Sequence, residues 1–138
     1  MINKVDHIGI AVRSISQSLP FYRDVLGMEL IREENVPSQL VKVAFLDAGN
    51  QKIELLEPSS PESPVARFLE KRGEGIHHIA YRVQNLEERI ADLKSKDITM
   101  IDEVPRIGAG GASIAFLHPK STGGTLTELC EKKGNDKR

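Results

Sequence analysis

The fold is decided by the stretch Val5-Asp6-His7-Ile8-Gly9-Ile10-Ala11-Val12, because a similar stretch returns 71 residues later. The second copy is Ile76-His77-His78-Ile79-Ala80-Tyr81-Arg82-Val83. A second pair of stretches, Ile53-Glu54-Leu55-Leu56-Glu57 and Thr127-Glu128-Leu129-Cys130-Glu131, repeats at an offset of 74 residues. Two similar offsets in one chain indicate an internal duplication, so we expect two halves of like structure.

Each half shows the same succession of one strand, one helix and three further strands. The later extended runs are rich in Val, Ile, Leu, Phe and Thr, which favour strands. We expect these runs at 29–33, 40–47 and 52–56 in the first half and at 98–103, 112–118 and 125–130 in the second. Gly49-Asn50 and Gly123-Gly124 mark the hairpin turns before the last strand of each half. Each half therefore predicts a β-α-β-β-β module.

Capping residues locate the helix of each module. Ser14 with Gln17, and Asn85 with Glu88, fit or approximate a capping box. Pro20 conflicts with the first helix, because proline has no backbone N–H and disrupts a helix interior. The first helix therefore either begins later than Ser14, at a nearby serine, or is kinked at Pro20.

A short helix is predicted between the modules. Ser63 suits its N-cap, Pro64 its first position and Gly73 its end. A half of about 65 residues is marginal as an independent domain, so we expect the modules to form one domain. The expected boundaries are one domain at 1–132, with modules at about 1–58 and 75–132, a helical linker at 59–74 and a polar tail at 133–138.

Composition excludes several classes of protein. The net charge is −1, there is no Trp, and no basic stripe is present, so we expect no nucleic-acid partner. No apolar run is long enough to span a membrane, and Asp6 and Arg13 interrupt any signal-peptide pattern. The single cysteine fits a reducing compartment, so we expect a cytoplasmic protein.

Two histidines and two glutamates occupy corresponding places in the halves, namely His7 with His78 and Glu54 with Glu128. A solitary His or Glu on a strand is usually a surface residue, and an edge strand with water-facing glutamates is the alternative interpretation. Four corresponding positions make that interpretation less economical, because a carboxylate among apolar strand neighbours needs a compensating cation. If the halves pack symmetrically, two imidazoles and two carboxylates converge on a divalent-metal site.

The remaining histidines are expected outside that site. His77 precedes His78 and therefore points to the opposite face of its strand. Asp6 precedes His7 as His77 precedes His78, so we expect its side chain to point away from the metal site as well. His118 precedes Pro119 at a turn, which indicates a structural role.

Residues 1 to about 132 resemble the vicinal oxygen chelate superfamily, which includes glyoxalase I, extradiol dioxygenases and methylmalonyl-CoA epimerases. The motifs similar to the epimerases are Asp6-His7-Ile8-Gly9-Ile10-Ala11-Val12, Glu54-Leu55-Leu56-Glu57-Pro58 followed by Ser63-Pro64-Val65-Ala66, Gly75-Ile76-His77-His78-Ile79-Ala80, and the stretch from Gly108 through His118-Pro119-Lys120 to Leu129. The resemblance implies an α+β fold, with paired βαβββ modules forming an eight-stranded open β-cup. It implies that His7, Glu54, His78 and Glu128 are metal ligands.

The resemblance also implies an activity. We expect (R)- and (S)-methylmalonyl-CoA to be interconverted by metal-assisted proton abstraction through an enolate, with Glu128 as the proton-transfer residue. The expected partners are an acyl-CoA substrate and a second copy of the chain in a homodimer. The cofactor is a divalent ion, and a His/Glu site accepts Co, Ni, Mn, Zn or Fe. Val43 stands where some epimerases carry a second carboxylate, so the second acid/base is unassigned. The alternatives are a glyoxalase I type of isomerase and a metal-free binding protein of the same fold.

The segment Gly108-Ala109-Gly110-Gly111 has two interpretations. Its backbone amides could approach a phosphate or pantetheine group, or it could be a simple turn between two strands. It lacks the strand–loop–helix context of a phosphate-binding P-loop. Lys42, Arg106 and Lys120 are the candidate basic residues for coenzyme A.

Overall fold

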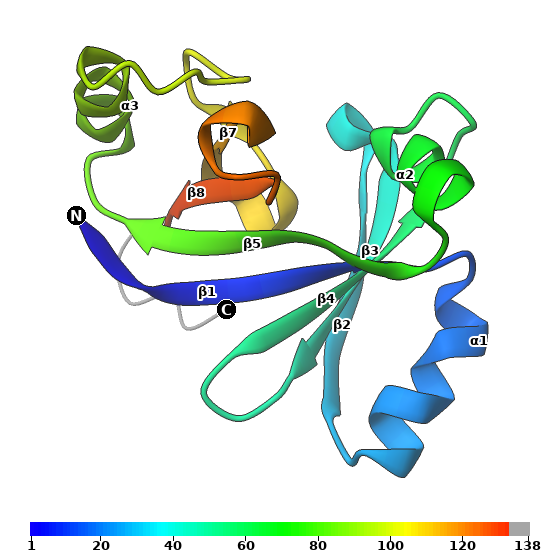
Figure 1. The fold of residues 1–138 in the computed structure, drawn as a ribbon. Coiled ribbons are helices and arrows are strands. Elements are labelled where there is room, and N and C mark those ends of the chain that lie inside the picture. The colour runs from blue at the N-terminus through cyan, green and yellow to red at the C-terminus, as the bar shows by residue number, and fades with distance from the viewer. Residues whose placement is uncertain (133–138) are drawn as a thin grey trace. The chain divides into compact units, whose positions relative to one another are not determined.

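The computed structural model describes residues 1–132 and consists of two compact units (Figure 1). The His7 unit comprises His7–His77. The His78 unit comprises Met1–Asp6 and residues 78–132. The first strand, β1 (Ile2–Ala11), therefore contributes residues to both units. The predicted polar tail at 133–138 lies outside the described residues.

The His7 unit contains residues 7–11 of β1 and a four-stranded sheet in the order β1-β4-β3-β2. Strand β1 is parallel to β4, whereas β3 is antiparallel to both β4 and β2. In chain order, the elements after β1 are α1 (Ile15–Leu19), η1 (Pro20–Val25), β2 (Glu29–Val36), η2 (Pro37–Gln39), β3 (Val41–Asp47), β4 (Lys52–Pro58) and α2 (Pro64–Arg72).

The His78 unit repeats this topology, with the strand order β5-β8-β7-β6. Strand β5 is parallel to β8, and β7 is antiparallel to β8 and β6. Its elements are the part of β5 (Gly75–Val83) from His78 on, α3 (Leu86–Ser95), β6 (Arg106–Ile107), η3 (Ala109–Gly111), β7 (Ser113–Leu117), η4 (Pro119–Ser121) and β8 (Thr127–Glu131). The prediction of two β-α-β-β-β modules is confirmed.

The first helix resolves the conflict at Pro20. The Ser14 side chain accepts a hydrogen bond from the backbone N–H of Gln17 at 3.3 Å, so the helix does begin after Ser14. At Pro20 the α-helix changes into a π-helix, in which the Leu26 N–H donates to the Phe21 carbonyl at 3.0 Å. The chain therefore accommodates a proline without a backbone N–H by changing from an α-helix to a π-helix. The helix does not need to begin later than Ser14.

The linking helix is confirmed. Helix α2 begins after Ser63, whose side chain accepts a hydrogen bond from the Val65 N–H at 3.1 Å. It ends at Gly73, whose φ of 75° is readily adopted only by glycine.

The strand predicted at 98–103 is wrong. This segment makes only one isolated bridge, between Met100 and Leu117, and the edge strand is β6. The Asp102 carboxylate accepts a hydrogen bond from the Phe116 N–H at 2.8 Å, while the Asp102 N–H donates to the Phe116 carbonyl at 3.2 Å. The Asp102 side chain thus takes the place of a backbone carbonyl as the acceptor for the Phe116 N–H. Regular strand pairing with β7 starts only at Arg106.

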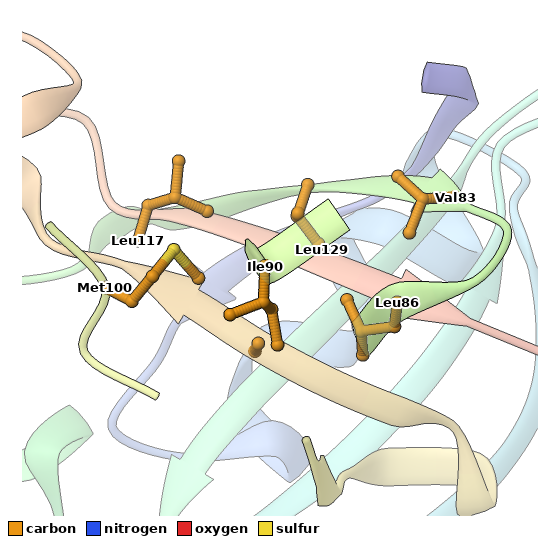
Figure 2. Packing of buried hydrophobic residues seen from close by; sticks show 7 residues of the cluster. Val83, Leu86, Ile90, Met100, Leu117 and Leu129 are labelled. Carbon is orange, nitrogen blue, oxygen red and sulfur yellow. The ribbon is translucent and has the colours of Figure 1, made fainter. Parts of the chain in front are cut away.

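Each sheet buries one face against its own helix. In the His78 unit, Leu86 and Ile90 of α3 pack with Leu117 and Leu129 of the sheet, as Figure 2 shows. In the His7 unit, Ile15 and Leu19 of α1 belong to a corresponding cluster. Because successive side chains of a strand point to opposite faces, every second residue of these strands lies on the face of the sheet that does not contact the helix.

Candidate functional site

His7 and Glu54 lie on the face of the His7-unit sheet that is opposite to α1. Strand β1 is parallel to β4, with Gly9 paired to Glu54 and His7 paired to Lys52. Glu54 Oε2 lies 3.2 Å from His7 Nδ1. The two side chains are only 7% and 6% exposed, although both are polar.

His78 and Glu128 form the equivalent pair in the His78 unit. Strand β5 is parallel to β8, with Ala80 paired to Glu128. Glu128 Oε1 lies 3.3 Å from His78 Nε2, and each side chain is 6% exposed. The Phe116 ring packs edge-on against the His78 ring with centroids 5.5 Å apart, which fixes the ring orientation.

The chemistry of these donors suits a divalent cation. A neutral imidazole nitrogen and a carboxylate oxygen that face each other need a proton or a cation between them. Burying a carboxylate without such a partner is costly. Imidazole nitrogen and carboxylate oxygen are both ordinary ligands of divalent transition metals. Each unit therefore brings together the histidine and glutamate that the repeat singled out.

Asp6 and His77 have structural partners instead. Asp6 is buried and accepts hydrogen bonds from the Arg82 guanidinium at 2.7 and 3.0 Å, with the Lys132 ammonium 3.3 Å away. The His77 ring packs edge-on against Phe68, with centroids 5.1 Å apart. Burial lowers the pKa of His77 to about 4, so this imidazole is neutral at pH 7.

His118 occupies the structural position expected for it. Its Nδ1 accepts a hydrogen bond from the Lys120 N–H at 3.1 Å, which caps the short η4 turn. The candidate Lys120 thus belongs to the same turn.

The glycine-rich segment is a turn between β6 and β7. The Gly108 N–H donates to the Ala112 carbonyl at 2.9 Å, and the Gly111 N–H donates back to the Gly108 carbonyl at 3.2 Å. Gly110 has φ of 70° and Gly111 has φ of 76°, conformations that favour glycine. The turn interpretation therefore accounts for these glycines.

A row of three side chains crosses the His7-unit sheet, and sequence reasoning missed it. Phe45 is opposite Glu54, and Arg32 is opposite Phe45, so all three share one face. The Arg32 guanidinium lies 4.1 Å from the centre of the Phe45 ring, a cation–π contact. A β-bulge between Leu30 and Arg32 produces this register, because the extra residue moves Arg32 to the face of Glu54.

The His78 unit has an equivalent row. Phe116 is opposite Glu128, and Arg106 lies on the same face, with its guanidinium 5.6 Å from the centre of the Phe116 ring. Arg106 Nε also lies 3.1 Å from Asp102 Oδ1. The signal was present in the sequence, since the two Phe are 71 and the two Arg 74 residues apart. These are the same offsets as those of the His and Glu pairs.

Of the candidate basic residues, Arg106 lies on the face of the His–Glu pair and Lys42 does not. Lys42 alternates with Val43 along β3, so it points to the α1 side of the sheet, and its Nζ lies 3.1 Å from Glu33 Oε1. In the described part of the chain, no helix has the length and apolar character needed to span a membrane.

Comparisons with known proteins agree on one family. A family model described as "Glyoxalase/Bleomycin resistance protein/Dioxygenase superfamily" matches residues 6–116. An ethylmalonyl-CoA/methylmalonyl-CoA epimerase of Cereibacter sphaeroides is 40% identical over 131 residues, which are 94% of this chain and 98% of that protein. A hypothetical protein from Bacillus halodurans has a crystal structure with a TM-score of 0.94 at 56% identity, and 98% of each chain is covered.

One similar structure contains a substrate. It is described as methylmalonyl-CoA epimerase in complex with methylmalonyl-CoA and NH4+, and it is 35% identical with a TM-score of 0.92 over 100% of both chains. By contrast, a lactoylglutathione lyase of Arabidopsis thaliana is 25% identical, and the match covers 91% of this chain and 43% of that protein.

Proposed function

The chain belongs to the glyoxalase/bleomycin resistance protein/dioxygenase superfamily, and on that premise we propose that it is a methylmalonyl-CoA epimerase. In this reaction the hydrogen on the carbon between the thioester and carboxylate groups leaves from one face and returns to the other. The observation that carries the proposal is the occurrence of two buried His–Glu pairs in a chain similar to such epimerases over nearly its whole length.

We propose that both pairs bind a single divalent ion. His7 and Glu54 come from the first and last strands of one module, and His78 and Glu128 come from the equivalent strands of the other. Two neutral imidazoles and two carboxylates balance a 2+ charge. The ion, which could be Co, Ni, Mn, Zn or Fe, supplies Lewis-acid stabilisation of the negative charge that develops on the substrate oxygens.

Glu128 is the proposed proton-transfer residue. Proton removal beside a thioester leaves an electron pair that delocalises into an enolate. A positioned carboxylate takes up that proton, and Glu128 is held next to the site by its contact with His78. His78 orients Glu128 through their 3.3 Å contact, and Phe116 in turn orients His78.

We also propose the partners and the location of the protein. Its substrate is an acyl-CoA, its functional form is a homodimer, and its location is the cytoplasm. The single cysteine, Cys130, is buried and unpaired by disulfide, which suits a reducing compartment.

A paired assay tests the proposed function. The purified protein, supplied with each candidate metal, is incubated in parallel with (R)-methylmalonyl-CoA and with the methylglyoxal–glutathione adduct. We expect interconversion of the methylmalonyl-CoA epimers and no turnover of the adduct. Consumption of the adduct without epimerisation would assign the protein to the glyoxalase I reaction. Absence of both activities and of bound metal would indicate a binding protein of the same fold.

A further inference from the structure

The substrate of the proposed function carries oxyanions, namely the carboxylate of its acyl group and the phosphates of coenzyme A. We propose that Arg106, on β6, binds one of these oxyanions through the terminal nitrogens of its guanidinium. This inference rests on the proposed function and adds a substrate-binding residue to it. Arg106 and its contacts all belong to the His78 unit.

The register of the His78-unit sheet places Arg106 on the face of the His78–Glu128 pair. Arg106 is opposite Ile114 of β7, which is opposite Cys130 of β8. Glu128 lies two residues before Cys130 on the same strand. Directly opposed residues share a face, as do alternate residues of one strand. The guanidinium therefore extends from the edge strand over the same face as the pair.

A short series of contacts connects Arg106 to that pair. The centre of the Phe116 ring lies 5.6 Å from the guanidinium carbon of Arg106 and 5.5 Å from the centre of the His78 ring. His78 Nε2 in turn lies 3.3 Å from Glu128 Oε1. One aromatic ring thus lies between Arg106 and His78, a separation that a single acyl-CoA molecule is long enough to bridge.

Two contacts hold the guanidinium without engaging its terminal nitrogens. Arg106 Nε lies 3.1 Å from Asp102 Oδ1, and the guanidinium lies over the Phe116 ring in a cation–π contact. Asp102 is shared, because its Oδ2 accepts a hydrogen bond from the Phe116 N–H at 2.8 Å. Among the described residues, none forms a hydrogen bond or an ion pair with the terminal nitrogens of Arg106, whose side chain is 40% exposed.

Such a guanidinium suits an oxyanion. The planar fork of an arginine binds a carboxylate or a phosphate with two parallel hydrogen bonds. A side chain that is already held in place loses less conformational freedom when it binds. Arg106 is therefore prepared to receive an anionic group of the substrate.

Two further arginines lie on the His–Glu faces, but carboxylates already occupy their terminal nitrogens. In the His78 unit, Arg82 donates to Asp6 Oδ1 through Nε at 3.0 Å and through Nη2 at 2.7 Å. In the His7 unit, Arg32 Nη2 lies 3.4 Å from Glu34 Oε1. An incoming anion would have to displace these carboxylates, whereas at Arg106 it would not.

The test compares Arg106→Gln with Arg23→Gln. Arg23 is a matched control, because its side chain is 44% exposed and its Nε lies 3.0 Å from Asp24 Oδ1, but it belongs to η1 and not to a sheet. Rates of methylmalonyl-CoA epimerisation are measured with metal-loaded protein, together with the thermal melting profile and the metal content. We expect Arg106→Gln to raise KM about 10- to 100-fold and to keep kcat within a few fold, as for a lost charged hydrogen bond. Arg23→Gln should behave like wild type.

A second substrate identifies the oxyanion. The methylmalonyl thioester of pantetheine keeps the carboxylate but lacks the phosphates of coenzyme A. If Arg106 binds the carboxylate, Arg106→Gln raises the KM for this thioester by the same factor as the KM for methylmalonyl-CoA. If Arg106 binds a phosphate, the variant and the wild type have the same KM for the thioester. Either result, together with the raised KM for methylmalonyl-CoA, supports the oxyanion site.

Two results with Arg106→Gln would overturn the inference. A KM for methylmalonyl-CoA within about twofold of wild type would show that Arg106 binds no part of the substrate. A fall in kcat at unchanged KM, or a loss of metal, would show that Arg106 instead keeps Phe116 and His78 in position.

A second variant covers the case in which Arg106→Gln does not fold. Arg106→Lys keeps the positive charge beside Asp102 but lacks the planar fork, so it should still raise KM several-fold. A wild-type KM in Arg106→Lys would contradict binding by the fork. Absence of epimerisation by the wild-type protein would refute the proposed function itself, and this inference with it.

Discussion

The carboxylate of Glu131 caps α3, because its Oε1 accepts a hydrogen bond from the Leu86 N–H at 3.0 Å. Its other oxygen accepts from the Asn85 N–H at 2.9 Å. Glu57 does the same in the His7 unit, where its Oε1 accepts from the Ile15 N–H at 2.7 Å. In each module the last strand thus carries two glutamates with different partners. The first contacts the histidine of the His–Glu pair, and the second, three residues later, caps the N-terminus of the helix.

We predict that Glu131→Ala destabilises the protein by about 1–2 kcal/mol, the usual cost of losing a helix N-cap. The change removes acceptors from two backbone N–H groups and a negative charge from the positive end of the helix dipole. Urea denaturation of the wild type and the variant measures the difference. Glu87→Ala, in the first turn of the same helix but exposed, is the control and should cost a few tenths of a kcal/mol. Equal unfolding midpoints for the two variants would contradict the assigned capping role.

The capping of α3 shows why part of the fold was not predictable from sequence. The expected capping box with Asn85 is wrong, because Asn85 adopts φ of 55° and its side chain makes no capping bond. Glu131, 46 residues further along the chain, caps the helix instead. Local sequence rules detect caps within a few residues, whereas this contact depends on the pairing of β5 with β8. The Glu57–Glu131 repeat was visible, but its role required the structure.

The His–Glu pairs were predictable because the internal duplication places a histidine and a glutamate at corresponding positions in both halves of the sequence. His7 and Glu54, separated by 46 intervening residues, would carry little meaning alone, but His78 and Glu128 repeat the combination. The faces followed from strand alternation, which holds in β1, β4, β5 and β8. Alternation failed in β2, where one bulge placed Arg32 on the face of Glu54. The repeat offsets of the Phe and Arg residues were visible in the sequence, but no pattern marks the bulge, so the face on which Arg32 lies was not predictable.

We predict that His7→Ala loses most of the bound metal and activity, whereas His77→Ala keeps both. His7 contacts Glu54, and His77 packs on Phe68. Metal content per chain, measured by elemental analysis after loading with cobalt or nickel, checks the prediction. A similar loss of metal from both variants would mean that the strand faces are misassigned.

We predict that Cys130 resists thiol reagents in the folded protein. The residue is 1% exposed, and burial raises the pKa of its thiol, so little thiolate is present. The rate of modification by a chromogenic disulfide reagent should rise sharply when urea unfolds the chain. Fast modification in native buffer would show that the face of the β8 strand carrying Glu128 opens readily.

We predict that Glu128→Gln loses turnover by about 10²-fold or more while retaining some metal. The amide oxygen can still coordinate an ion, but the amide cannot accept a proton. Metal content and epimerisation rate are measured on the same preparation. A metal-loaded variant that works at the wild-type rate would leave Glu128 as a ligand only.

Solvent exchange shows whether the substrate passes through an enolate during epimerisation. Metal-loaded wild-type protein is incubated with (R)-methylmalonyl-CoA in deuterated water, and the carbon bearing the methyl group is followed by proton NMR and mass spectrometry. We predict incorporation of one deuterium at that carbon as the R and S forms interconvert, because the abstracted proton can exchange before one is returned. Recovery of unlabelled, unepimerised substrate from metal-loaded protein would contradict it.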